Sequence, residues 1–396
     1  MTKLINLKIF PHFFKSSSAG GILLLFAVAI SLIIANTNWA DDFAEILNIP
    51  LGFETESLKL RYPILLWIND GLMAIFFLLV GLEIKREVVE GELSTLKQAA
   101  LPVLAAIGGV VVPAAIYTVF NNNSPETIHG WGIPMATDIA FALAILSLLG
   151  KSVPTGLKIF LAALAIVDDL IAILVIAIFY SKELHLDYLG YAAGVFAFLI
   201  ILNRLGVKNI FCYLVPGVVM WYLIHHSGIH ATIAGVLTAI TLPTNDVDKE
   251  SPLEILEHAL TQPVNFIIMP IFALANTNIT FESGMVEGLT SSLGLGIVLG
   301  LFLGKPIGIF LMSFLAVKGR VCELPVNTNF IHVLGLGLLG GIGFTMSIFI
   351  ALLSFDEVFL QTEAKFSILV ASVLAGLIGF ILLKVYSRKK GYQQEV

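Results

Sequence analysis

The chain has 396 residues, of which 58% are hydrophobic and only 13% are charged, whereas a soluble globular chain carries roughly 25% charged residues. Too few charges remain to coat a soluble surface of this size, which excludes an ordinary soluble globular protein. The net charge of −6 is spread over short segments, and no basic patch suggests nucleic acid. Cys212 and Cys322 show neither metal-ligand spacing nor a disulfide framework.

The first residues combine Lys3, Lys8 and Lys15 with an apolar stretch from Gly21 to Ala35. This pattern is compatible with a cleavable secretory signal. The apolar run is long enough to span a membrane, however, and its basic flank suits a cytoplasmic N-terminus. We therefore expect a retained first helix.

Apolar runs recur along the whole chain at about the 20-residue length that a helix needs to cross roughly 30 Å of hydrocarbon. They predict an all-α polytopic membrane protein with twelve transmembrane helices and both termini in the cytoplasm. Most Lys and Arg residues then fall in cytoplasmic segments, as the positive-inside rule requires. The expected spans are Gly20–Asn36, Ile64–Leu82, Gln98–Phe120, Trp131–Gly150, Leu157–Tyr180, Leu186–Leu202, Ile210–Ile224, Ile229–Leu242, Glu257–Asn276, Leu289–Ala316, Phe330–Leu353 and Phe366–Val385.

The outer loop at residues 37–63 alternates apolar with other residues on both sides of a polar centre. Such alternation predicts a small extracytoplasmic β-hairpin. An isolated hairpin is marginally stable in water. It is therefore expected either to contact a second copy of the chain, giving a homodimer, or to lie flat on its own protomer.

Two spans are interrupted in corresponding places, about 200 residues apart. One carries Pro134 and Asp138 near its middle, and the other carries Gly340, Gly343 and Thr345. Residues 98–180 and 289–385 are therefore expected to be inverted-topology repeats whose broken helices cross within a single transporter domain. The alternative is that the glycines only allow close helix packing.

Few ionisable residues lie inside the spans: Asp70, Asp138, Asp168, Asp169 and Lys305. A charge at the bilayer centre costs from about 2.5 to over 10 kcal/mol, so such residues usually have a function. Neighbouring helical residues point about 100° apart. Asp168 and Asp169 are therefore expected to have different partners.

One of these two aspartates can face Asp138 and Thr137 at the broken helix, where oxygen ligands suit a small hard cation. The other can pair with Lys305. Two close buried carboxylates resist ionising together, so protons and cations compete for the same oxygens. A protein that reorients with this site either protonated or cation-loaded, but not empty, exchanges the two.

A charged cluster is expected at the cytoplasmic membrane face, where the second span ends and the ninth begins. Ordinary flanking charges that mark topology are one interpretation, and a sensor of cytoplasmic pH is the other. Its members are Glu83, Arg86, Glu87, Glu257 and His258.

Several long motifs in this order resemble the NhaA family of sodium/proton antiporters over nearly the whole chain. Because that family is a known example of inverted repeats, the resemblance and the repeat argument are not independent. The matching stretches are Leu66-Trp-Ile-Asn-Asp, Phe76-Phe-Leu-Leu-Val-Gly-Leu-Glu-Ile-Lys-Arg-Glu, Ala136-Thr-Asp-Ile-Ala-Phe-Ala-Leu, Ala165-Ile-Val-Asp-Asp-Leu, Leu256-Glu-His, Gly304-Lys-Pro and Gly341-Ile-Gly-Phe-Thr-Met-Ser-Ile-Phe-Ile.

The resemblance implies that the protein lies in the inner membrane and exchanges sodium or lithium for protons, that this exchange is electrogenic and that it is regulated by pH. It further implies a homodimer without a cofactor or enzymatic activity. It implies Asp168 and Asp169 as the ion site, Asp138 as compensation of the crossed helices, and Lys305 either as the partner of Asp168 or as compensation of the opposite helix ends. One departure is Thr261, where some members carry a second histidine after Leu-Glu-His.

Three other functions compete with exchange. A sodium-coupled solute symporter would use the same broken helices but would need a roomy polar pocket. An intramembrane aspartyl protease would place its aspartates on separate helices within a Gly-x-Gly-Asp motif, whereas Gly-Ile-Gly here ends in Phe344. A channel is disfavoured because no repeated charged ring or carbonyl filter motif is present.

Overall fold

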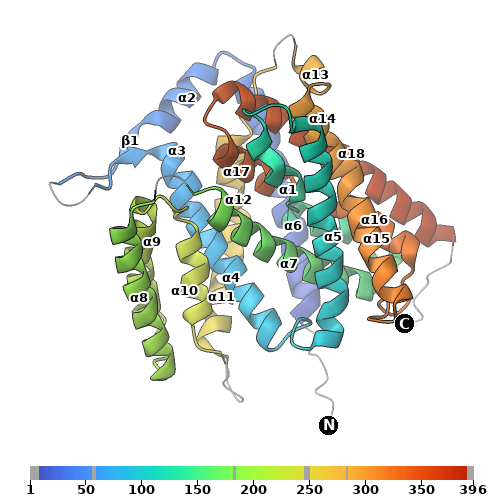
Figure 1. Cartoon of the computed structure of the whole chain (residues 1–396), viewed down its shortest axis with the longest axis horizontal. Coiled ribbons are helices and arrows are strands. Elements are labelled where there is room, and N and C mark those ends of the chain that lie inside the picture. Colours follow the sequence, from blue (N-terminus) through green and yellow to red (C-terminus); the bar gives the residue numbers. More distant parts are fainter. Residues whose placement is uncertain (1–8, 56–58, 182–183, 245–249, 282–283, 390–396) are drawn as a thin grey trace.

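The computed structural model describes residues 9–55, 59–181, 184–244, 250–281 and 284–389, and the regular structure of these parts is almost entirely helical (Figure 1). The elements are α1 Ile9–Ala35, α2 Ala40–Asn48, β1 Pro50–Leu51, β2 Tyr62–Pro63, α3 Ile64–Leu66, η1 Trp67–Leu72, α4 Met73–Val89, α5 Leu96–Asn121, η2 Ile128–Met135, α6 Ile139–Leu148, η3 Gly150–Ser152, α7 Thr155–Phe179, α8 Leu186–Arg204, α9 Phe211–His226, α10 Ile233–Thr241, α11 Pro252–Pro263, η4 Val264–Ile268, α12 Met269–Asn276, α13 Met285–Gly288, α14 Ser292–Leu299, η5 Gly300–Gly304, α15 Lys305–Lys318, α16 Phe330–Gly340, α17 Phe344–Ser354 and α18 Val358–Lys389.

In the described part of the chain, eight helices are long and apolar enough to cross a membrane, or up to ten if each of two bent helix pairs is one span. The predicted count of twelve is therefore not confirmed. The two expected spans that fall short correspond to α9, with 16 residues, and α10, with 9 residues. At 1.5 Å per residue α10 is about 14 Å long, less than half the hydrocarbon thickness.

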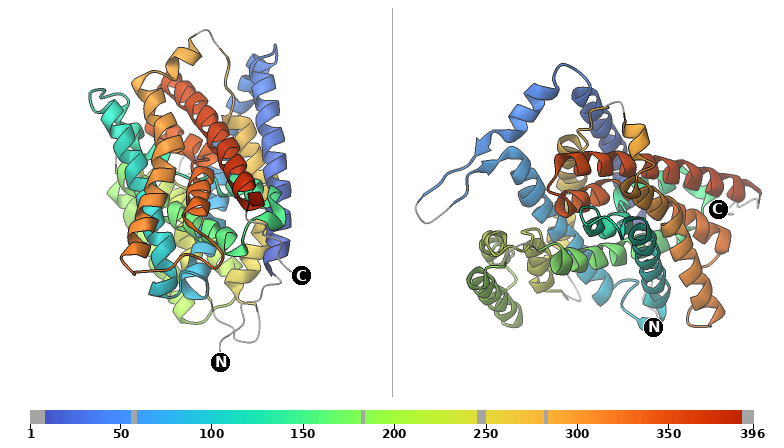
Figure 2. Two further views of the ribbon diagram at one scale, coloured as in Figure 1. Left: turned by 90° about the vertical axis from the view of Figure 1, so that its right-hand side faces the viewer. Right: turned by 45° about the horizontal axis from the view of Figure 1, so that its top comes forward.

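The helices form a main bundle with a smaller group beside it (Figures 1 and 2). The main hydrophobic core joins α1, α4 to α7, α12 and α14 to α18. A second core joins α8, α9 and α10 to one face of α4 and to α11. Helix α4 therefore connects the two groups, and the interrupted helices lie within the main bundle.

Helices α5 and α15 pack closely where Gly108 faces Gly308. A Cβ at Gly108 would lie 2.2 Å from the Gly308 carbonyl oxygen, and a Cβ at Gly308 would lie 2.0 Å from the Gly108 carbonyl oxygen. Only glycine fits at both positions, because any side chain would overlap the opposite backbone. The two glycines thus bring α5 next to the helix that carries Lys305.

The predicted hairpin occupies only part of residues 37–63. Helix α2 fills the first part, and the strands β1 and β2 pair with Leu51 opposite Tyr62, followed by an isolated bridge between Glu54 and Lys59. The hairpin extends away from the helical bundle (Figure 1). Leu51 and Phe53 are 55% and 57% exposed there.

Candidate functional site

Two helices are interrupted in the middle, and their interruptions lie against each other. The first changes from η2 to α6 across residues 136–138, and the second bends by 48° between α16 and α17. The Asp138 N–H donates to the Ile342 carbonyl at 2.6 Å, and the Ser347 hydroxyl donates to the Ile133 carbonyl at 2.7 Å. Each break therefore satisfies backbone groups that the other break leaves free, as a membrane interior requires.

Local sequence explains why the chain breaks and crosses here. Pro134 has no N–H to continue a helix and packs under Gly300, where an added Cβ would lie 2.7 Å from the Pro134 side chain. On the other broken helix, a Cβ at Gly341 would lie 2.4 Å from the Leu301 carbonyl oxygen. The proline ends one helix, and the glycines let the chains approach closely.

Asp138 joins the start of both second half-helices. Its Oδ1 accepts the Phe141 N–H at 3.1 Å and thereby caps α6. Its Oδ2 accepts the Thr345 N–H at 3.1 Å, and the Thr345 hydroxyl, at the start of α17. A buried carboxylate fits this position because helix N-termini carry partial positive charge. Both oxygens of Asp138 are therefore engaged at the crossing, and its role as compensation of the crossed helices stays a prediction.

Lys305 is fully buried and begins α15, directly after the π-helical turn η5. Its Nζ lies 2.7 Å from Asp168 Oδ2. It also donates to the Met135 carbonyl, at the C-terminal end of η2, where a positive charge complements the helix dipole. Of the two possibilities for Lys305 that the resemblance left open, pairing and compensation of helix ends, the structure contains both.

Thr137 links Asp168 to the other broken helix. Its Oγ1 lies 2.6 Å from Asp168 Oδ2 and 2.9 Å from the Gly340 carbonyl oxygen, at the end of α16. A hydroxyl has one proton, so it donates to only one of these acceptors at a time. Asp168 Oδ2 contacts both the Lys305 ammonium and the Thr137 hydroxyl, so it is the more fully engaged oxygen of that carboxylate.

The remaining carboxylate oxygens lack such partners. Asp168 Oδ1 is buried without a hydrogen bond, and Asp169, only 3% exposed, makes no hydrogen bond or ion pair with any residue that the structure describes. The charges that act on Asp169 are those of Asp168, Glu83, Asp138 and Lys305. Buried carboxylate oxygens without donors need a proton or a cation to compensate them.

These oxygens are hard ligands of the kind that alkali cations prefer. Within the described ranges, no three or more His, Cys, Asp or Glu side chains are grouped to hold a metal ion. A cation at Asp168 and Asp169 would therefore need backbone carbonyl or hydroxyl oxygens as further ligands. The Thr137 hydroxyl contacts Asp168, and the Gly340 and Met135 carbonyls at the two breaks contact Thr137 and Lys305, the two partners of Asp168.

The predicted charged cluster forms at the end of α4, around Arg86. One guanidinium nitrogen lies 3.2 Å from Glu257 Oε1, and another lies 3.1 Å from Glu87 Oε1. Glu83 interacts electrostatically with all three of these residues. Because Glu83 also acts on Asp169, this cluster is electrostatically connected to the buried aspartates.

Glu92 and His258 lie at the edge of this cluster. The Glu92 N–H donates to Glu87 Oε2 at 2.9 Å, and burial together with the charge of Glu87 raises the pKa of Glu92, which follows the span. His258 was predicted as a member, but its side chain is 51% exposed and lies 3.8 Å from Glu250. The structure therefore brings Glu83, Arg86, Glu87 and Glu257 together and points His258 outward.

Sequence reasoning missed three polar contacts between segments that are far apart in the chain. The first is the contact between Thr345 and Asp138. The only feature of the sequence that could have indicated it is a threonine directly after the glycine-rich break. Lys85 donates to the Ile240 carbonyl at 2.6 Å and to the Leu242 carbonyl, at the C-terminal end of α10. Asp70 pairs with His225 at 3.1 Å, a partner about 150 positions away that no local pattern indicates.

Comparisons with known proteins show which family the chain belongs to. The profile of the family described as Na+/H+ antiporter 1 matches residues 11–383. The Na(+)/H(+) antiporter NhaA 2 of Flavobacterium johnsoniae is 74% identical, with 99% of this chain and 96% of the relative covered. NhaA of Flavobacterium psychrophilum is 51% identical over 95% and 96% of the two chains. NhaA of Yersinia enterocolitica is 48% identical over 97% of each.

A solved structure, that of the sodium proton antiporter MjNhaP1 from Methanocaldococcus jannaschii at pH 8, has a similar fold. The TM-score is 0.53 at 13% identity, over 98% of this chain and 99% of that one. At this identity the likeness concerns the fold alone. The length of the family match and the high identity of the relatives decide the assignment: the chain belongs to the Na+/H+ antiporter 1 family.

Proposed function

We propose that this protein is a secondary active antiporter that exports sodium or lithium in exchange for protons by alternating access. The observation that carries the proposal is Asp169, a buried carboxylate without a hydrogen-bonding partner in the described structure, next to the Asp168–Lys305 pair. The names of the relatives, Na(+)/H(+) antiporters, support sodium and protons as substrates.

The chemistry follows from competition at one set of oxygens. A sodium ion binds Asp169 and Asp168 Oδ1 when both carboxylates are ionised, and protons displace it. The oxygens cannot be left buried, charged and empty at low cost. The site therefore reorients either loaded with sodium or protonated, and each cycle couples the two fluxes.

Lys305 can supply a second proton. When sodium neutralises Asp168, the ammonium loses the charge that offset its burial and releases its proton. Two protons exchanged for one sodium would move one net charge, worth about 2.3 kcal/mol per 100 mV of membrane potential. Transport would then be electrogenic, and a negative interior would drive sodium export.

The proposed topology has twelve crossings, with α9 and α10 added to the longer spans, both termini in the cytoplasm and the hairpin outside. We assign the protein to the cell inner membrane as one transporter domain. Inverted repeats at 98–180 and 289–385 are supported by a common order: a long helix, an interrupted helix and a second long helix, in α5 to α7 and again in α14 to α18. A homodimer forms through the hairpin, whose exposed apolar side chains need a partner.

Regulation by pH belongs to the cluster around Arg86. Protonation of Glu83 changes the charge that acts on both Arg86 and Asp169, and protonation of Glu257 changes the charge that acts on Arg86. Acidification of the cytoplasm would therefore alter the site electrostatically before any ion binds. The predicted member His258 lies at the edge of this cluster, with its side chain half exposed and directed toward Glu250.

The test is transport by purified protein in liposomes that contain a trapped pH dye. An imposed sodium gradient should change the internal pH without any added solute. The pH should change faster when valinomycin and potassium dissipate the membrane potential that electrogenic exchange builds up against itself. A sodium-coupled symporter would move no protons under these conditions. An unchanged internal pH, with incorporation of the protein verified, would refute exchange.

A further inference from the structure

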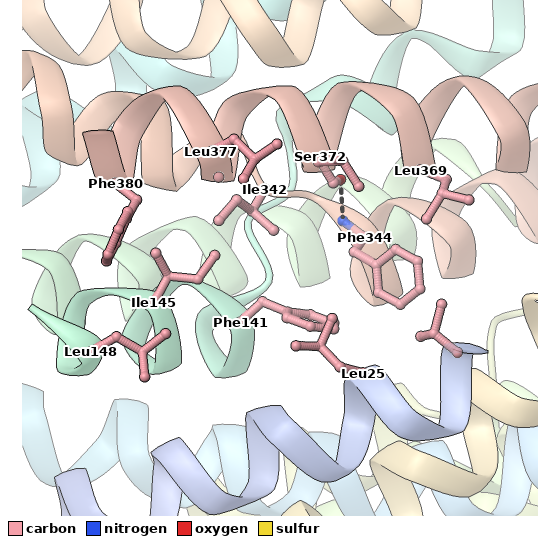
Figure 3. A pocket seen from close by; sticks show the side chains of 13 residues that line it. Leu25, Phe141, Ile145, Leu148, Ile342, Phe344, Leu369, Ser372, Leu377 and Phe380 are labelled. Carbon is pink, nitrogen blue, oxygen red and sulfur yellow. Dashed lines mark hydrogen bonds between the residues drawn. The ribbon is translucent and has the colours of Figure 1, made fainter. Parts of the chain in front are cut away.

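A pocket of about 400 Å³ lies on the main bundle between α1, α6, α17 and α18 (Figure 3). Its volume falls within the range of small-ligand sites. The lining is hydrocarbon except for Ser372, whose Oγ already accepts the Phe344 N–H at 3.2 Å. A polar or charged ligand would lose its hydration here without gaining partners. The pocket therefore suits a hydrocarbon ligand.

The pocket has an open rim and a buried floor. At the rim, Leu25, Leu148 and Leu377 are 56%, 66% and 57% exposed, whereas Ile342 and Phe344 on the floor are 3% and 2% exposed. The rim residues belong to apolar helices that qualify as membrane spans, alone or within a bent pair. Exposed apolar faces of such helices contact lipid. The mouth of the pocket therefore opens into the acyl chains of the bilayer.

A positive charge lies at one end of the pocket. Phe380 is part of the lining, and the Lys384 ammonium, one helical turn further along α18, lies 5.1 Å from the centroid of the Phe380 ring. Lysines at the ends of spans extend toward the level of the lipid headgroups. An ammonium there matches a phosphate, while the pocket below it matches the attached chain.

From these observations we infer that one acyl chain of a membrane phospholipid occupies this pocket, with its phosphate at Lys384. The chain would pack on Ile342 and Phe344, at the break between α16 and α17. The Ile342 carbonyl accepts the Asp138 N–H, so the lipid contacts the same backbone that fixes Asp138. Bound lipid therefore stabilises the crossing of the broken helices.

The test is photolabelling of the full-length protein in lipid nanodiscs. They contain phosphatidylglycerol with a diazirine at the end of one acyl chain, and labelled peptides are identified by mass spectrometry. We expect the label to concentrate on the lining residues of α6 and α18. Val373→Trp, at the rim, should abolish this labelling. Ile381→Trp, on the same helix and 56% exposed but outside the lining, should leave it intact.

Two further variants test whether a loss of labelling reflects an empty pocket rather than misfolding, and whether Lys384 binds the phosphate. Leu148→Trp blocks the opposite rim and should repeat the effect if Val373→Trp folds poorly. Lys384→Gln should lower labelling by the phospholipid but not by a diazirine fatty alcohol, which has no phosphate. Thermal unfolding of each variant shows whether it is folded.

Three results would overturn the inference. Label spread evenly over all exposed spans would mean ordinary surrounding lipid only. Equal labelling of Val373→Trp, Leu148→Trp and Ile381→Trp would place the chain elsewhere. Labelling that appears only after the oligomer dissociates would identify a second copy of the protein as the occupant. None of these readouts depends on transport, so the inference can fail while the proposed exchange stands.

Discussion

Asp168 and Asp169 are neighbours on α7 but have different surroundings. Asp168 contacts Lys305 and Thr137, whereas Asp169 is buried with only other charges acting on it. The difference arises because successive helical residues point about 100° apart. Lys305 therefore offsets one carboxylate, and the second must be offset by whatever enters the site.

Replacing Lys305 tests this pairing. Lys305→Met leaves the Asp168 charge buried and unpaired, so it should destabilise the protein by about 3–5 kcal/mol. In an Asp168→Asn background, Lys305→Met should lower the free energy of unfolding by at least about 1 kcal/mol less than in the parent protein, because no buried carboxylate charge is left without a partner. Thermal unfolding in detergent of the four proteins measures the difference. Strictly additive effects would mean that the two residues do not interact.

Thr345 should matter for stability through Asp138. Thr345→Val keeps the shape of the side chain but removes a donor from a buried charged acceptor, so a loss of about 1–3 kcal/mol is expected. Thr118→Val is the matched control, because its hydroxyl bonds only the Ala114 carbonyl one turn away on its own helix. Equal unfolding temperatures for the two variants would argue against a role of Thr345 at the crossing.

At the residue scale, the sequence identified the buried charges but not all of their partners. Asp138, Asp168, Asp169 and Lys305 could be predicted because a charge inside an apolar span is costly and conspicuous. Thr345 could not, because a threonine in a span is common and its contact with Asp138 exists only after two distant helices cross. Which residues act in transport remains a prediction.

The two broken helices are held together by side chains and backbone groups of each other. Neither helix could satisfy its free carbonyl and N–H groups alone within a membrane. The crossing in turn depends on how closely α5, α15 and α16 pack, because Lys305 extends from α15 to the Met135 carbonyl. The glycines at the contacts between these helices therefore help to position the Lys305 ammonium.

The contact between Gly108 and Gly308 gives a direct test. Gly308→Ala places a methyl group against the Gly108 carbonyl and should cost about 1–3 kcal/mol through overpacking. Gly194→Ala on α8 is the control: a Cβ there meets nothing within 4 Å, and alanine favours helix by about 1 kcal/mol. Unfolding measurements should move in opposite directions for the two. A neutral Gly308→Ala would show that the helices can separate freely.

At the element scale, apolar runs located nearly every long helix, but they missed α2 and the short α13 and gave α10 too great a length. Helix α2 lies within the segment predicted as the hairpin loop, although Phe43 and Leu47 are four residues apart and Asp41 and Asp42 suit a helix start. Its polar content hid it from a search for apolar spans. Helix α10 is shorter than its apolar run because the chain turns before residue 233.

The whole molecule combines a core that contains the crossed helices with a hairpin that extends outside it. Exposed apolar side chains on the helices that qualify as membrane spans suit contact with lipid, but the hairpin extends away from these helices, and its Leu51 and Phe53 are exposed. Exposed apolar side chains on a projecting element are typical of an interaction surface. This surface is therefore where the proposed dimer contact is tested.

Dimer formation should depend on these side chains. The double change Leu51→Asp and Phe53→Asp should shift the detergent-solubilised protein toward the monomer mass in light scattering, because two charges would have to be buried in the contact. Val326→Asp, on an exposed loop elsewhere, should leave the mass unchanged. A dimer that tolerates the double change would place the contact on another surface.

The central claim is that sodium and protons compete for the carboxylates of Asp168 and Asp169. It is tested most directly by adding sodium chloride to purified protein in weakly buffered detergent solution and following proton release with a pH dye, with choline chloride as the control salt. The parent protein and Asp187→Asn, a change at an exposed aspartate on α8, should release protons on sodium addition. Asp169→Asn should release few or none; release equal to that of the parent would contradict the claim.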